Sequence, residues 1–267
     1  MLKDITLGQY YKGDSAVHKL DPRAKILITI ALLVSLFMIK SWWGFLPVVL
    51  FLLATIFLSG VPFLYVVKGL KAIAVLIMIT GLFNVFLTDG TVWFKFYFLT
   101  ATYEGLNLAG FMVVRICLLI VVTSMLTLTT TPIMLTDGIE SLLKPLKKIK
   151  VPVHEFAMMM TIALRFIPTI MEETDKIMKA QSARGADFET GSLLKRAKAL
   201  IPILIPLFIS AFRRADELAV AMECRCYHGD NNRTKMKQLH YTWLDCLALL
   251  LVLVLFAFQF IAEGINL

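Results

Sequence analysis

The sequence predicts an all-α integral membrane protein with about five transmembrane helices and a cytoplasmic domain of two long helices and a shorter one. The first observation is composition, since 58% of the 267 residues are hydrophobic and only 17% are charged, which is more apolar than a soluble domain needs to be. The second is the presence of five long apolar stretches. Each approaches the ~20 residues that a helix needs to cross the hydrocarbon core of a bilayer.

The five predicted spans follow one another with short connections, except for a long gap before the last. The first two are short for the task, so tilting or local thinning of the bilayer is expected, while the fourth is long enough to protrude. All four tryptophans lie at segment ends, where amphipathic rings favour the headgroup region: Trp42, Trp43, Trp93 and Trp243. The predicted spans are Ala24 to Ile39, Trp42 to Ser59, Leu70 to Leu87, Tyr103 to Thr130 and Tyr241 to Ala262.

The distribution of lysine and arginine along the chain predicts the orientation in the membrane. Five of these residues lie between Met1 and Lys25 and seventeen between Thr131 and His240, whereas the loops assigned to the outer side hold only Lys40 and Lys95. Positive charge accumulates on the cytoplasmic side, so the N-terminus and residues 131–240 are predicted inside and the C-terminus outside. Topology and attraction to anionic lipid explain the net charge of +8 without a nucleic-acid partner.

No secretory signal peptide is expected from the N-terminal sequence, because the stretch from Met1 to Lys25 is rich in charge and lacks an apolar core with a cleavage site. The four cysteines are too few and too clustered for a disulfide framework, so reduced thiols are expected. They are Cys117, Cys224, Cys226 and Cys246.

Residues 131–240 resemble neither a loop nor a soluble domain, because their helical segments are long and apolar. Two helices are predicted, Val153 to Ala183 and Leu193 to Tyr227, with Pro152 before the first and glycines at the other ends. The apolar block at 201–212 is only about 18 Å long as a helix and contains Pro202 and Pro206, so it is a poor membrane crossing. It is expected to lie at the inner interface or beneath a partner.

The two long helices end in similar sequences. DKIMKAQSAR, from Asp175 to Arg184, aligns without gaps with DELAVAMECR, from Asp216 to Arg225. Acid, aliphatic residue, alanine and arginine coincide. Biased composition could produce such a match by chance, and the alternative is that each helix presents one arginine to one of two similar sockets.

An arginine at a helix C-terminus stabilises the helix by about 0.3–1 kcal/mol, because its positive charge interacts favourably with the helix dipole. This is the simplest explanation for Arg184 and Arg225. It does not explain the small residues Ala183 and Gly185 beside Arg184. These leave room for a partner's backbone, and a guanidinium can then bind a carboxylate bidentately. Truncating such a buried interface pair costs roughly 2–5 kcal/mol, well above the capping effect.

The segment of residues 131–240 resembles the cytoplasmic coupling domain of the transmembrane T component of energy-coupling factor (ECF) transporters. In that family, each of two coupling helices ends in an Ala-Arg-Gly-like motif. The N-terminal region is also similar to that family's S-x-x-H-x-L-D-P-R-x-K pattern. The second motif departs from the family, because Cys224 and Cys226 replace the small flanks of Arg225. The residues that match the N-terminal pattern are Tyr10, Gly13, Ser15, His18, Leu20, Asp21, Pro22, Arg23 and Lys25.

The resemblance implies a non-enzymatic coupling subunit without cofactor or metal. Its domains are then 1–130 with four spans, 131–240 as the coupling domain, and 241–267 with the last span. Each arginine is expected to dock on one of two ATP-binding cassette ATPase subunits, and the unequal flanks suggest a heterodimer. A separate membrane-embedded substrate-binding (S) component would hold a vitamin such as riboflavin or biotin, or nickel or cobalt, in a bacterial plasma membrane. Whether the T component is shared or dedicated to one substrate stays open.

Other patterns in the sequence bear on different functions. A membrane-embedded thiol or metal enzyme would use Cys224, Cys226, His228 and Cys246, but residues two apart on a helix point about 200° apart and cannot share one tetrahedral ion. No phosphate-binding GxxxxGK[ST] motif occurs. Arg115 is expected near mid-membrane, too far from Glu104 for a direct pair, with Asn84 as a possible neighbour. Asp21, Arg23, Asp175, Asp216 and Arg115 are the predicted structural or coupling residues.

Overall fold

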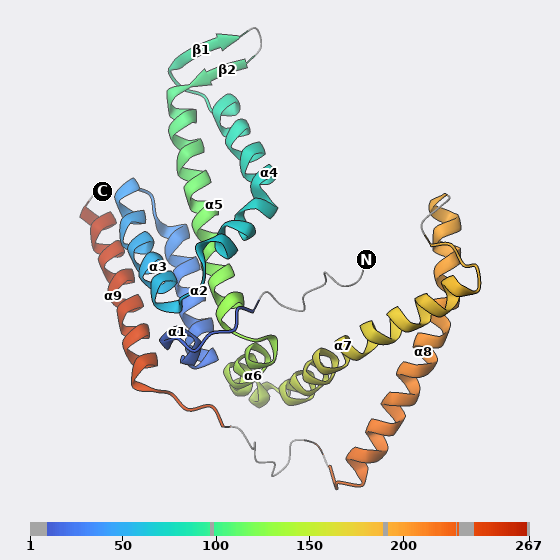
Figure 1. The fold of residues 1–267 in the computed structure, drawn as a ribbon. Helices are drawn as coiled ribbons and strands as arrows, with labels where there is room; N and C mark the ends of the chain where they lie inside the picture. The colour runs from blue at the N-terminus through green and yellow to red at the C-terminus, as the bar shows by residue number, and fades with distance from the viewer. Residues whose placement is uncertain (1–9, 97–98, 189–191, 228, 230–237, 266–267) are drawn as a thin grey trace. The chain divides into compact units, whose positions relative to one another are not determined.

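A computed structural model describes residues 10–96, 99–188, 192–227, 229 and 238–265 (Figure 1). The chain is helical along most of this length, as predicted. In order, the elements are α1 Ala16–Lys19, α2 Pro22–Met38, the 3-10 turn η2 Trp42–Gly44, α3 Phe45–Ser59, α4 Phe63–Leu87, β1 Val92–Phe96, β2 Leu99–Thr102, α5 Tyr103–Thr129, α6 Pro132–Leu143, η3 Lys144–Ile149, α7 Val153–Ala183, α8 Leu193–Glu223 and α9 Trp243–Ile265.

Four helical segments of the described chain are long and apolar enough to cross a membrane: Trp42–Ser59, Tyr103–Thr129, Val153–Ala183 and Trp243–Ile261. The two parts of α4, Phe63–Lys71 and Ile73–Leu87, are bent by 60° relative to one another. If they count together as one broken span, the number of candidate spans rises to five. The predicted third span therefore starts earlier than Leu70 and is broken. The helix of the first predicted span, α2, has 17 residues and rises about 25 Å, less than the ~30 Å hydrocarbon core.

The chain divides into two compact units, one formed by residues 8–139 with 239–267 and the other built around residues 140–238. The first unit holds α1 to α5 and α9. Its apolar core lies between α2, α3 and α5 and includes Leu32, Leu36, Val48 and Val122. Large apolar side chains remain exposed around this core, among them Phe57, which is 88% exposed, as expected for a surface that faces lipid.

Polar contacts fix α9 alongside α2. Near the start of both helices, the backbone N–H of Asp21 donates to Asp245 at 2.7 Å, and near their ends the Ser35 hydroxyl donates to Gln259 at 2.6 Å. The separation along the chain is the same for both contacts, so the two helices run in the same direction. Residues before α2 and before α9 therefore lie at the same face of this unit.

α5 runs antiparallel to α2. Lys25 donates to the carbonyl of Thr129 at one end, and Arg115 donates to the carbonyl of Ile39 at the other. The two helices are thus paired over about 21 Å, and the first turns of α5 extend about 18 Å past the end of α2. There α5 packs against α4, and the two strands form an antiparallel hairpin between these helices. The sequence predicts only an outer loop here, so the two strands differ from the prediction.

Residues 140–238 contain the two long helices, which cross one another (Figure 1). The predicted bounds of α7 are confirmed. α8 ends at Glu223, four residues before the predicted Tyr227, because the chain turns there. At the crossing, Arg214 of α8 donates to Glu173 of α7 at 2.8 Å and lies over the Phe166 ring.

Candidate partner-docking site

The C-terminus of α7 is closed by a Schellman turn. The N–H of Gly185 donates to the carbonyl of Ser182, and the N–H of Ala186 donates to that of Gln181, both at 3.0 Å. Gly185 has a φ of +84°, the left-handed conformation that this turn requires at the residue after the cap. Arg184 is the capping residue, and it is exposed together with Ala183 and Gly185.

The end of α8 repeats this turn. The N–H of Cys226 donates to the carbonyl of Glu223 at 2.8 Å, and the N–H of Tyr227 donates to that of Met222 at 3.1 Å. Cys226, which aligns with Gly185, is left-handed as well, with a φ of 56°. Arg225 occupies the same capping position as Arg184 and is exposed with its two cysteine neighbours. The sequence similarity therefore corresponds to a repeated backbone structure.

This geometry gives Gly185 a reason that sequence reasoning did not provide. An added Cβ would meet nothing within 4 Å, so it is the backbone conformation that favours glycine here. Cys226 adopts the same conformation with a side chain, which costs roughly 1–2 kcal/mol for an L-residue.

The crossing of α7 and α8 places both arginines at equal distances along their helices. Glu173 and Arg214 form the ion pair at the crossing, and they occupy equivalent positions in the alignment of the two helices. Each precedes the arginine of its own helix by eleven residues, about 16 Å of helix, without an intervening proline. The prolines inside these helices, Pro168, Pro202 and Pro206, all precede the crossing.

The predicted Asp175 and Asp216 do not lie beside the arginines. Each precedes its arginine by nine residues, or two and a half turns, and so points to the opposite face of the helix. Asp175 is half-buried and Asp216 is exposed. Their alignment reflects the repeated helix and places neither carboxylate beside an arginine.

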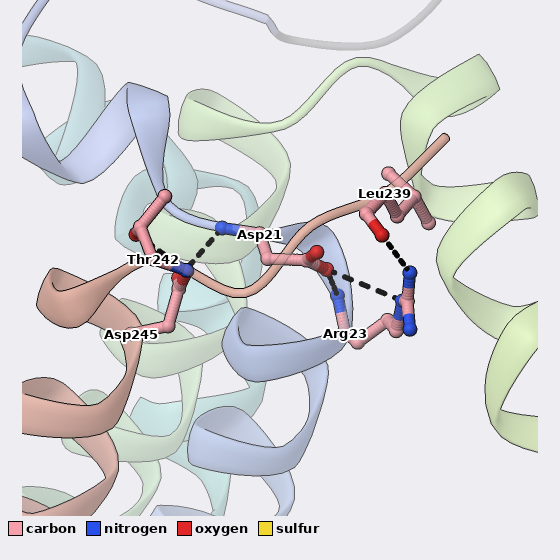
Figure 2. Close-up of polar contacts among 5 residues, drawn as sticks. All are labelled: Asp21, Arg23, Leu239, Thr242 and Asp245. Atoms are coloured by element: carbon pink, nitrogen blue, oxygen red, sulfur yellow. Dashed lines mark hydrogen bonds and ion pairs between the residues drawn. The ribbon is translucent and has the colours of Figure 1, made fainter. Parts of the chain in front are cut away.

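The start of α2 forms a polar cluster with the start of α9 (Figure 2). Asp21 caps α2 by accepting from the N–H of Arg23 at 2.9 Å. Arg23 in turn donates to the carbonyl of Leu239 at 2.8 Å and lies over the ring of Tyr241. Asp245, fully buried, accepts from the N–H and the hydroxyl of Thr242 and from the N–H of Asp21.

The remaining residues of the N-terminal pattern complete this cluster. The His18 ring lies between the Ser15 hydroxyl at 2.7 Å and the carbonyl of Tyr11 at 3.0 Å. Lys25 is buried, and its ammonium donates to His18, Thr129 and Thr130. The pattern thus joins the starts of α2 and α9 and the end of α5, at the point where the chain resumes at Leu239.

Comparison with known proteins identifies the family. A family model described as CbiQ, cobalt transport protein, matches residues 13–236. The chain belongs to the CbiQ family. Among its relatives, the energy-coupling factor transporter transmembrane protein EcfT of Clostridium kluyveri is 59% identical over 96% of this chain and 95% of its own length. The EcfT proteins of Ruminiclostridium cellulolyticum and Bacillus subtilis are 58% and 48% identical, covering 92% and 97% of this chain and 92% and 98% of their own lengths.

This CbiQ-family chain is therefore a multi-pass transmembrane component of an ECF transporter and a non-enzymatic subunit of that complex. The alternative of a thiol or metal enzyme is wrong. Cys224, Cys226 and Cys246 are exposed, whereas His228 lies outside the described residues. Within the part of the chain that the structure describes, no group of three or more His, Cys, Asp or Glu could hold a metal ion.

The structure gives Arg115 of this CbiQ-family chain a partner other than Asn84. Its guanidinium donates to the carbonyl of Ile39 and lies over the Phe111 ring, whereas Asn84 bonds back to Thr80 within α4. Glu104 accepts from Thr91 and forms no pair with Arg115, as its distance along the helix predicted. Sequence reasoning also missed Asp245 and Gln259, since a single polar residue in an apolar helix has no spacing that indicates its partner.

Proposed function

We propose that this chain couples two ATPase subunits to a membrane-embedded substrate-binding component, with Arg184 and Arg225 as the two docking points. Residues Ala183, Gly185, Cys224 and Cys226 form the immediate surroundings of these arginines. ATP hydrolysis in the partner subunits moves the two helix ends, and α7 and α8 transmit this motion to the substrate binder, which reorients and releases a vitamin or another micronutrient inside the cell.

The observation that carries the proposal is the repeated turn at the ends of α7 and α8. A Schellman turn is a common helix ending, but here both turns carry an exposed arginine at the capping position, directly before the left-handed residue. Two identical turns that present two exposed guanidinium groups fit a partner with two similar sockets. The cysteine flanks of Arg225 favour two non-identical ATPase chains.

The orientation follows from charge and from the pairing of α2 and α9. Because these helices run in parallel, residues before α2 and residues before α9 share one face of the membrane unit. Along the sequence, the segments rich in lysine and arginine directly precede these two helices, so we assign that face to the cytoplasm, with the C-terminus outside. Residues 131–240 are then the coupling domain, between a membrane part at 1–130 and a last span at 241–267. The separation of residues 140–238 as a compact unit supports this division.

The test is substrate uptake by the complete transporter reconstituted in vesicles. Arg184→Ala with Arg225→Ala is expected to abolish ATP-driven uptake, because each truncation removes a bidentate interface contact. Two control variants are expected to retain uptake: Arg213→Ala, which removes an exposed cation elsewhere on α8, and Cys224→Ser with Cys226→Ser, which removes the thiols. Full uptake by the arginine double variant would contradict the proposal.

A further inference from the structure

An exposed basic segment, residues 143–150, connects α6 to α7. Its sequence is LKPLKKIK, which combines lysines with large apolar residues and contains no acid. All of its residues are exposed, and Ile149 is 76% exposed. These residues take no part in the docking proposed above or in the polar cluster at the starts of α2 and α9.

The backbone of the basic segment separates its apolar residues from its lysines. η3 is a 3-10 helix with three residues per turn, so side chains three residues apart lie above one another. Leu146 and Ile149 therefore share one side of η3, and Leu143, the last residue of α6, extends it. Lys144 and Lys148 lie on the other two sides. The result is an exposed apolar stripe with a lysine on either flank.

The lysines of the basic segment are available to a partner. Lys144, Lys148 and Lys150 are exposed, and the side chains of these three form no ion pair or hydrogen bond with any described residue. The nearest acid along the chain, Glu140, lies before the segment, and its carboxylate is 3.0 Å from Nδ1 of His154. Cations that flank an apolar stripe match a surface that offers anionic groups above hydrocarbon.

α6 keeps the basic segment near one face of the membrane unit. Gly138 of α6 is buried against the start of α2, where an added Cβ would lie 3.1 Å from Ile26 and 3.2 Å from Pro22. Lys144 follows Gly138 by six residues, which is about 9 Å along the helix. Because α2 begins at this face, the headgroup region of the bilayer lies at the same level. A single short helix thus holds the basic segment within reach of the headgroups.

The short length of the basic segment is offset by its attachment to a membrane protein. A free peptide of this length would bind a bilayer only weakly, whereas a tethered one meets the surface at a high effective concentration. Each lysine near an anionic surface strengthens the association by about fivefold, and burial of the apolar stripe adds to this.

We propose that the basic segment binds anionic phospholipid headgroups of the bilayer around the membrane unit, with its apolar stripe in the interface and its lysines against phosphate groups. This contact holds the connection between α6 and α7 at the bilayer surface. The proposal uses neither Arg184 nor Arg225, so either proposal can fail without the other. It also does not depend on which face is cytoplasmic when both leaflets carry the same lipids.

The test is acetylation of lysines by a water-soluble reagent, followed by mass spectrometry of peptides. The full chain is held in nanodiscs of phosphatidylcholine alone or mixed with phosphatidylglycerol. Lys144 and Lys148 are expected to react about threefold more slowly in the mixed bilayer, because a surface potential of roughly −30 mV raises the local proton concentration by that factor. Lys176, exposed on α7, is the internal reference and should change less than about twofold. If Lys144 and Lys148 slow no more than Lys176, the proposal is overturned.

A substitution in the apolar stripe separates binding from mere proximity. Ile149→Ser is expected to return Lys144 and Lys148 to within about twofold of their rates in the neutral bilayer, because the stripe no longer anchors the segment. Leu194→Ser is the matched control, since Leu194 of α8 is also an aliphatic residue that is 76% exposed. It should leave the slowing unchanged. Full slowing in Ile149→Ser would contradict the role of the stripe.

Two further outcomes are assigned in advance. Soluble glycerol phosphate, added to the neutral nanodiscs, should leave the rates unchanged, and slowing equal to that by phosphatidylglycerol would mean that a free phosphate ester is the ligand. The rates are also compared in neutral detergent with and without the ATPase and substrate-binding subunits. Slowing that requires those subunits and not the anionic lipid would make the basic segment a protein-docking surface, and the lipid proposal would be wrong.

Discussion

The left-handed Cys226 allows the repeated turn to be tested by a single substitution. Cys226→Gly removes a Cβ from a residue with a φ of 56°, a conformation that costs an L-residue roughly 1–2 kcal/mol. Glycine also increases the conformational entropy of the unfolded chain, and this opposes the gain in stability by about 0.5–1 kcal/mol. The net stabilisation of the turn is therefore about 0.5–1 kcal/mol, equivalent to a few-fold decrease in local opening.

Hydrogen exchange measured by mass spectrometry on peptides that cover residues 220–227 reports this opening. Cys226→Gly is expected to increase protection of these amides a few-fold. Cys224→Gly is the matched control, since the N–H of Cys224 still donates to the carbonyl of Val220 in helical fashion. Glycine there should lower protection, by about 0.5–1 kcal/mol of helix propensity. Gly185→Ala should lower protection of the α7 turn for the opposite reason.

The sign of the effect is what decides. If Cys226→Gly and Cys224→Gly change protection in the same direction, Cys226 does not occupy the left-handed position of a Schellman turn, and the structural equivalence of the two helix ends is lost.

The other predictions concern contacts within each of the two units. Asp245→Asn should destabilise the membrane unit by about 2 kcal/mol in thermal unfolding. One oxygen of the buried carboxylate accepts from Asp21 and the other from Thr242, and an amide has only one oxygen to accept with. An unchanged unfolding midpoint would argue against the cluster at the start of α9. Gly105→Ala should destabilise by about 1–3 kcal/mol, since its Cβ would lie 2.8 and 2.9 Å from two carbonyl oxygens of α4, whereas Gly110→Ala, whose Cβ meets the Trp42 ring at 3.4 Å, should be tolerated. Glu173 and Arg214 form a partly exposed ion pair at the crossing, and a double-mutant cycle in unfolding experiments should give a coupling energy of about 0.5–1 kcal/mol. Exchanging the two charges should restore the stability of the pair. Additive effects of the single substitutions would show that the ion pair contributes nothing.

Sequence reasoning predicted the long helices well, because Pro152 and Gly185 mark the ends of α7 and the apolar spacing between them is helical. It extended α8 too far, because a left-handed cysteine carries no sequence signal comparable to Gly185. The same reasoning recognised the two arginines from their repeated context, although the turn that holds them became visible only in the backbone.

Contacts between helices far apart in the sequence were harder to predict from the sequence. The N-terminal pattern indicated that Asp21 and Arg23 matter, but their partners Asp245 and Leu239 lie near the other end of the chain and are brought close by the parallel pairing of α2 and α9. The sequence offered Asn84 only as a possible neighbour of Arg115. The structure pairs Arg115 with a backbone carbonyl instead, since the end of α2 exposes carbonyls that have no partner within the helix.

Counting ATPase chains bound per transmembrane subunit tests the docking account most directly. Native mass spectrometry of the complex in mild detergent should find two ATPase chains on the unmodified protein and on Arg213→Ala. Arg184→Ala with Arg225→Ala should leave the subunit without ATPase chains, while the substrate-binding component remains. Two ATPase chains retained by the double variant would contradict the claim that these helix ends hold the ATPases.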